Sequence, residues 1–166
     1  MSNKKQISNR KKGLTIVEVG LAIVGGIVVT ILGTMAWSEV SFRLDKNELV
    51  SQVTEINAGA DTWKGFKSNF TGLSMSVLCA AGQQSVSAKT CGGIGGSGTN
   101  TNAYGGNFVL AAGSNLSQKS LQITGLPSER INELADSLAP MTANQCSAAS
   151  GCPSLTTSGT TITLTL

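Results

Sequence analysis

Residues 14–37 form one long apolar run that carries a single charge. The run reads LTIVEVGLAIVGGIVVTILGTMAW, and its only ionisable side chain is Glu18. A helix of this length would span about 36 Å, at about 1.5 Å per residue, whereas the apolar core of a bilayer is about 30 Å thick. We therefore expect a helix over this run that crosses a membrane.

The positive charge of the chain is concentrated just before this run. Five Lys and Arg residues lie between Lys4 and Lys12, and the other seven are outnumbered by the nine Asp and Glu residues, all of which follow Leu14. The net charge of +3 therefore belongs to the N-terminal tail, and we expect no nucleic-acid-binding surface on the body of the chain. The positive-inside rule places the N-terminus in the cytoplasm and the body across the membrane.

The chain contains four cysteines and no histidine. The absence of histidine excludes His-dependent catalytic triads and the common His metal sites, and the absence of CxxC pairs argues against an all-thiolate zinc site. We expect no metal, no cofactor and two disulfides formed in an oxidising compartment. Three pairings are possible, and we favour the two local ones, which join Cys79 to Cys91 and Cys146 to Cys152.

Glu18 helps to decide whether the apolar run is a secretory signal peptide, a plain membrane anchor or the start of a processed chain. A carboxylate costs roughly 2.5–3.5 kcal/mol at the bilayer centre and less near an interface, so it needs a cationic partner, and the run contains no basic side chain. Cleavage between Gly13 and Leu14 would create an α-amino group close to Glu18. A secretory signal peptide would have a shorter apolar region and an A-x-A-like exit, and a plain membrane anchor would leave Glu18 without a partner.

The residues around Gly13 resemble the prepilin peptidase motif of type IV pilins and pseudopilins. The segment Lys11-Lys12-Gly13-Leu14-Thr15-Ile16-Val17-Glu18 contains basic residues, the glycine, an apolar first mature residue and a glutamate at the fifth mature position. The 13-residue leader and Leu14 resemble the type IVb class. Further segments are loosely similar to the thin-pilus pilins of conjugative plasmids: Trp63, 71–75, Leu78-Cys79, Cys91-Gly92 and 104–107.

This resemblance implies a role for each residue of the motif and a set of partners. Gly13 would be recognised by the prepilin peptidase, Leu14 would become the N-terminus, often N-methylated in this family, and Glu18 would pair with the N-terminal amine of a neighbouring subunit. The partners would be further copies of the chain in a helical homopolymer, the prepilin peptidase, and the inner membrane with its pilus assembly machinery. A single-pass inner-membrane precursor would thus become part of an extracellular pilus.

Three functions remain open on the sequence alone. The leading one is a structural subunit of a type IVb pilus, which is not an enzyme. A minor pilin or a type II secretion pseudopilin is the alternative within the same fold. A membrane-anchored periplasmic enzyme or binding protein is a remote alternative, because the chain has neither histidine nor a GxSxG motif.

The hydrophobic pattern divides the chain into four segments. Residues 1–13 are the leader, 14–37 the transmembrane or fibre-core half of an N-terminal helix, 38–66 its amphipathic half, and 67–166 a globular α/β head. In the amphipathic half, apolar residues recur at intervals of three and four and form one stripe along a face of the helix. These residues are Leu49, Val53, Ile56, Ala60 and Trp63.

The head shows period-two patterns that predict an antiparallel sheet. We expect strands at 107–112, 121–124 and 161–166, the last with Ile162, Leu164 and Leu166 on its buried face. A short helix between them would begin near Pro127 and end before Pro140, burying one apolar face made of Ile131, Leu134, Ala135 and Leu138.

The predicted class is α+β, with the pilin fold. A long N-terminal α-helix at about 14–66 would pack on an antiparallel β-sheet in a small, disulfide-stapled C-terminal domain. The segment from Gly93 to Gly98 matches GxGxxG, but it follows no predicted strand and precedes no predicted helix, so we expect a surface loop.

Overall fold

The computed structural model describes the backbone of residues 16–82 and 85–166 and the side chains of residues 37–82 and 85–166. The chain divides into two compact units between Ser41 and Phe42. We call the second unit, Phe42–Leu166, the head. The later part of the N-terminal helix, from Phe42 onward, therefore belongs to the same compact unit as the sheet.

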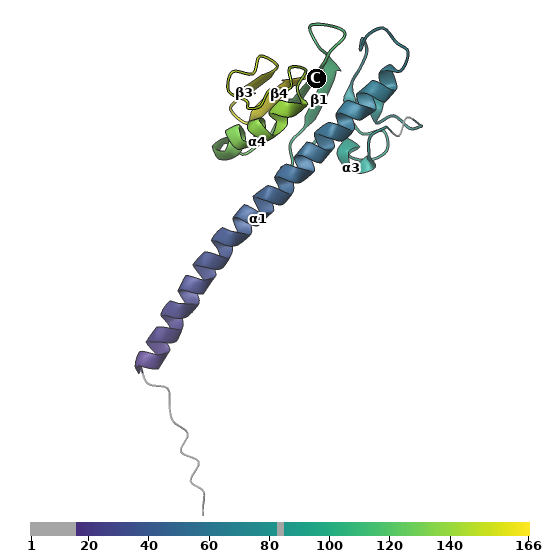
Figure 1. The fold of residues 1–166 in the computed structure, drawn as a ribbon. Helices are drawn as coiled ribbons and strands as arrows, with labels where there is room; N and C mark the ends of the chain where they lie inside the picture. The colour runs from purple at the N-terminus through teal and green to yellow at the C-terminus, as the bar shows by residue number, and fades with distance from the viewer. Residues whose placement is uncertain (1–15, 83–84) are drawn as a thin grey trace, which may run out of the picture. The chain divides into compact units, whose positions relative to one another are not determined.

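The first element, α1, covers Ile16–Lys64 (Figure 1). Within the head its apolar stripe is buried as predicted, because Leu49, Val53, Ile56 and Ala60 are all fully covered and Trp63 packs partly buried against the same core. The helix ends where Gly65 adopts the left-handed conformation (φ 48°). Glycine is the usual residue at such a helix end, because it has no Cβ to clash.

No helix that is long and apolar enough to cross a membrane occurs among the residues whose side chains are described. The predicted span, residues 14–37, lies outside that part of the chain except for Trp37.

The sheet of the head is antiparallel and has four strands in the order β1-β2-β4-β3. This arrangement confirms the α+β class. The strands are β1 (Phe108–Ala112), β2 (Lys119–Ile123), β3 (Leu155–Ser158) and β4 (Thr161–Thr165). In β4, Ile162 and Leu164 are fully buried and Leu166 follows at 9% exposure, as the alternation predicted.

Two strands differ from the sequence-based expectation. The edge strand β3 was missed, because of its four residues only Leu155 is buried, which leaves no alternation to detect. The start of β2 was placed two residues too late, because Lys119 occupies an inward-facing position beside Leu121 and Ile123. A lysine at an inward position does not fit an apolar pattern.

Short helices complete the head. The predicted one is α4 (Ile131–Leu138), which buries Leu134, Ala135 and Leu138 and lies between the 3₁₀ turns η1 (Ser128–Arg130) and η2 (Ala139–Met141). Two further helices of one turn each, α2 (Met75–Leu78) and α3 (Ala88–Cys91), were not predicted. The segment from Gly93 to Gly98 is a loop with three glycines at positive φ, as expected.

Candidate functional site

The residues predicted from the sequence fall into two groups. The predicted cleavage site, Gly13 and Leu14, lies outside the described residues, and Glu18 lies in α1 where only the backbone is described. The four cysteines all lie in the head, where they form the two predicted disulfides. These disulfides and the elements that hold them are therefore the part of the predicted site that can be built up from the structure.

The first disulfide joins α2 to α3. Cys79 follows α2, Cys91 ends α3, and their Cα atoms are 5.6 Å apart. Each helix begins with a serine whose hydroxyl oxygen accepts a hydrogen bond from a backbone N–H in the first turn, Ser74 for α2 and Ser87 for α3. Such N-caps let very short helices form, and the disulfide then holds the two helices together.

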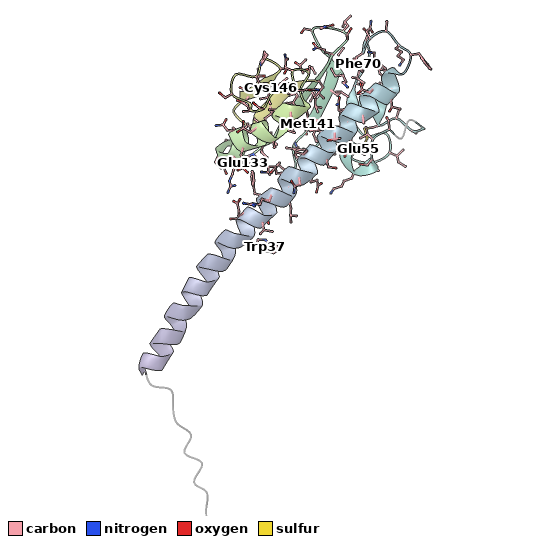
Figure 2. The ribbon with its side chains drawn as sticks, viewed as in Figure 1. Trp37, Glu55, Phe70, Glu133, Met141 and Cys146 are labelled. Carbon is pink, nitrogen blue, oxygen red and sulfur yellow. A yellow bond between two sulfur atoms is a disulfide. The ribbon has the colours of Figure 1, made fainter. Side chains whose placement is uncertain are left out.

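Glu55 ties this disulfide loop to α1. Its carboxylate accepts hydrogen bonds from the backbone N–H and the hydroxyl of Ser87 and from the hydroxyl of Thr90 at 2.8 Å. A carboxylate at the first turn of a helix satisfies N–H groups that have no partner inside the helix. Figure 2 labels Glu55 beside α1. Its hydrogen bonds to Ser87 and Thr90 attach the disulfide loop to that helix.

A mainly apolar cavity of about 510 Å³ lies beside this disulfide. Its lining includes Leu78, Val86, Cys91 and Ile94, and Ile94 is 83% exposed at its rim. The lining residues are apolar or small, and none of them is charged. The cavity therefore offers apolar contact area and no side chain suited to acid–base chemistry.

The second disulfide lies between α4 and β3. Cys146 and Cys152 have Cα atoms 5.8 Å apart, and the loop that they close is held to α4 by the Ala149 N–H, which donates to Asp136 Oδ1 at 2.8 Å. Cys152 is 8% exposed and belongs to the core. The C-terminal loop is thus attached to α4 much as the first disulfide loop is attached to α1.

An aromatic and charged cluster lies where α1 meets the loop before β1. The rings of Phe42 and Tyr104 are 6.3 Å apart, and the guanidinium of Arg130 lies 4.4 Å from the Phe42 ring. Glu133 accepts hydrogen bonds from Lys46 at 2.8 Å and from Arg130 at 3.4 Å. The hydrogen bond from Lys46 is the main reason why the pKa of Glu133 is lowered.

Tyr104 is the polar group of this cluster that is least well satisfied. Its hydroxyl oxygen is buried and has no hydrogen-bond partner within the described residues. Burial, with smaller contributions from Asp45 and Glu133, raises the pKa of Tyr104 to about 12. Tyr104 therefore remains a neutral phenol near neutral pH.

Neither a candidate metal cluster nor a free thiol occurs among the described residues. In the parts of the chain that the structure covers, no group of three His, Cys, Asp or Glu side chains lies close enough to hold a metal ion. The cysteines are all in disulfides, so none is available as a nucleophile. The arrangement is suited to presenting a rigid, stapled surface.

Sequence patterns did not identify Glu55, Lys119 and Tyr104. Glu55 lies on α1 beside the apolar stripe, where a charged residue is expected to face solvent. Of these three residues, only Lys119 left a signal in the sequence. It lies two residues before Leu121, at a position that a period-two pattern assigns to the buried face of β2. The partners of Glu55 are 32 and 35 residues away in the chain, and a single sequence carries no signal for such contacts.

Comparison of the chain with protein-family models, with curated proteins and with solved structures finds no match.

Proposed function

We propose that this chain is the precursor of a type IVb pilin, a structural subunit that polymerises through its N-terminal helix after a prepilin peptidase removes residues 1–13. The observation that carries the proposal is Glu18, the only charge in an apolar run of 24 residues, four positions after Leu14 and preceded by Lys11-Lys12-Gly13. The freed amine of Leu14 on a neighbouring copy would neutralise Glu18 inside the fibre. One ion pair then replaces two unmatched charges.

Two properties of the head support this proposal. The head combines helices with an antiparallel sheet, which is compatible with the pilin fold expected from the resemblance. Its two disulfides are typical of a protein exposed to an oxidising environment, as the surface of a filament outside the cell would be.

Intact-mass analysis tests the proposed processing. Chain from the membrane or sheared-filament fraction should begin at Leu14, with or without the mass of one added methyl group. Gly13→Glu should block cleavage and leave residues 1–13 in place. The matched control, Ser8→Glu, introduces the same charge within the leader and should still be cleaved. Retention of the first thirteen residues in the wild-type chain would contradict the proposal.

A second experiment tests the role of Glu18. Glu18→Val should allow membrane insertion, because it makes the run more apolar, but should abolish or severely reduce filament formation. The control is Thr30→Val, which also replaces a polar residue of the same run by valine and should assemble normally. Electron microscopy of sheared material provides the readout. Normal numbers of filaments from the Glu18→Val chain would exclude the proposed pairing.

A further inference from the structure

The end of α1 carries an exposed aromatic ring between two cations. Phe66 is fully exposed (111%) and directly follows Gly65, whose left-handed φ of 48° turns the chain at the end of the helix. Lys64 and Lys67 lie on either side of it in the sequence. We call these three residues, Lys64, Phe66 and Lys67, the tip of the head.

The charge of the tip is not balanced inside the head. Asp61, the nearest carboxylate in the sequence, already pairs with Lys119 at 2.6 Å. In the described part of the chain, neither Lys64 nor Lys67 forms an ion pair. The ammonium groups lie instead over rings of the head itself, Lys64 4.7 Å from the Phe70 centroid and Lys67 3.4 Å from the Trp63 centroid. The tip therefore carries two positive charges and an uncovered ring.

The surface formed by η1 and α4 has the opposite charge. Glu129 and Asp136 are exposed, and among the described side chains neither has a basic partner within ion-pair distance. Between them, Glu133 is already neutralised by Lys46 and Arg130. We call Glu129 and Asp136 the acidic pair. It matches the tip in number of charges and is opposite to it in sign.

The tip and the acidic pair cannot satisfy one another within one head. Phe70, which lies under Lys64, and Glu133, which lies between the acidic residues, appear well apart, toward opposite ends of the head (Figure 2). In a filament whose subunits all point the same way, one end of a head faces the other end of a neighbouring copy. When one surface of a copy binds a different surface of the next copy, each copy keeps one of its two surfaces free. Further copies can then add at both ends, and the result is an open fibre.

We propose that the tip of one copy docks on the acidic pair of a second copy. This inference rests on the proposed function, because it assumes a filament of parallel subunits. The two lysines would face Glu129 and Asp136 across the contact, and Phe66 would be buried between the two heads. Charge complementarity of this kind mainly fixes which surfaces meet, and burial of an exposed aromatic ring adds apolar stabilisation.

A charge swap tests this contact. Lys64→Glu with Lys67→Glu should lower the yield of sheared filaments at least about tenfold, the effect of about 1.4 kcal/mol. Glu129→Lys with Asp136→Lys should do the same. The chain that carries all four substitutions restores opposite charges across the contact, so its yield should return to within about threefold of the wild type. Asp136 Oδ1 also accepts the Ala149 N–H, so the thermal unfolding midpoint of the fourfold variant is measured alongside its yield. Failure to recover with a midpoint equal to that of the wild type would overturn the proposal.

Matched controls separate the contact from general effects of charge and exposure. Lys64→Gln with Lys67→Gln should lower the yield, whereas Thr156→Glu with Ser158→Glu, which alters net charge by the same amount on exposed positions of β3, should not. Phe66→Ala should lower the yield, whereas Ile94→Ala, at a residue 83% exposed elsewhere, should not. Equal yields from each variant and its control would contradict the docking contact.

The outcome also distinguishes this inference from the proposed function. A wild-type chain that is cleaved at Leu14 and forms filaments, while Lys64→Gln with Lys67→Gln leaves the yield unchanged, would refute only the docking contact. A wild-type chain that forms no filament would refute both proposals. If those two substitutions spared assembly but removed binding of the filaments to single-stranded DNA or to anionic phospholipid vesicles, the tip would serve a different partner and the contact between copies would be wrong.

Discussion

The Nζ atom of Lys119 lies 2.6 Å from Oδ1 of Asp61, and this ion pair joins β2 to α1. The two side chains are very differently exposed, at 6% for Lys119 and 59% for Asp61. Lys119 also donates to the carbonyl oxygen of Asn57 at 3.4 Å and lies 5.1 Å from the centroid of the Phe70 ring. A buried ammonium is thus held between a helix and a sheet by one partly exposed carboxylate.

Because Lys119 is buried, loss of Asp61 should matter more than an ordinary surface substitution. Asp61→Ala should lower the free energy of unfolding by about 1–2 kcal/mol, less than for a fully buried pair because Asp61 is more than half exposed. Once Lys119→Met has removed the buried charge, adding Asp61→Ala should have little further effect. Urea unfolding of the full chain in mild detergent measures these values. Glu129→Ala is the control and should stay within about 0.5 kcal/mol.

The two disulfides should stabilise the head to different extents. Their cysteines are 12 and 6 residues apart in sequence, and a longer loop loses more entropy when it is closed in the unfolded chain. Cys79→Ser with Cys91→Ser should lower the free energy of unfolding by about 3 kcal/mol, and Cys146→Ser with Cys152→Ser by about 2 kcal/mol. Denaturation of each variant in parallel with the wild type would measure both losses. The reverse order would contradict the loop-length explanation.

Gly59 allows α1 to approach the first disulfide loop closely. A Cβ atom at this position would lie 2.8 Å from Cγ2 of Val86 and 2.9 Å from the carbonyl oxygen of Ser85. Gly59→Ala should therefore lower stability by about 1–2 kcal/mol, although alanine favours a helix more than glycine does. Ser51→Ala, at an exposed position of the same helix, should be neutral or slightly stabilising. Thermal unfolding of both variants provides the comparison.

Tyr104 should make the stability of the head depend on pH at alkaline values. The pKa of Tyr104 is raised to about 12, above the value of about 10 in an unfolded chain. Its contribution to stability is therefore complete below about pH 10 and is lost as the pH rises toward 12. Because this is the only tyrosine in the chain, the absorbance of tyrosinate reports its ionisation directly.

The Tyr104→Phe variant provides the matching stability measurement. It should remove this part of the alkaline loss and, because the buried hydroxyl has no partner among the described residues, change stability at neutral pH by no more than about 1 kcal/mol. The difference between wild type and variant cancels the ionisation of lysines, which the two chains share. A tyrosinate transition near pH 10 in the folded protein would contradict the raised pKa.

Local patterns in the sequence were sufficient for the main elements of the head. The apolar stripe of α1 from Leu49 onward, the alternation in β4 and the apolar face of α4 each repeat with the period of one element. The disulfide pairs could be chosen because cysteines close in sequence meet easily. The cleavage residues Gly13 and Leu14 and the role of Glu18 remain predictions, since they depend on residues outside the described side chains.

Only the tertiary structure decided which polar groups meet across the head. The amphipathic pattern and cysteine spacing determined the α+β class and the local disulfides, because each depends on residues near one another in the chain. The pairing of Lys119 with Asp61, the attachment of Ser87 to Glu55 and the pairing of β2 with β4 join residues far apart in sequence. Such contacts depend on how complete elements pack, and side-chain periodicity carries no information about that packing.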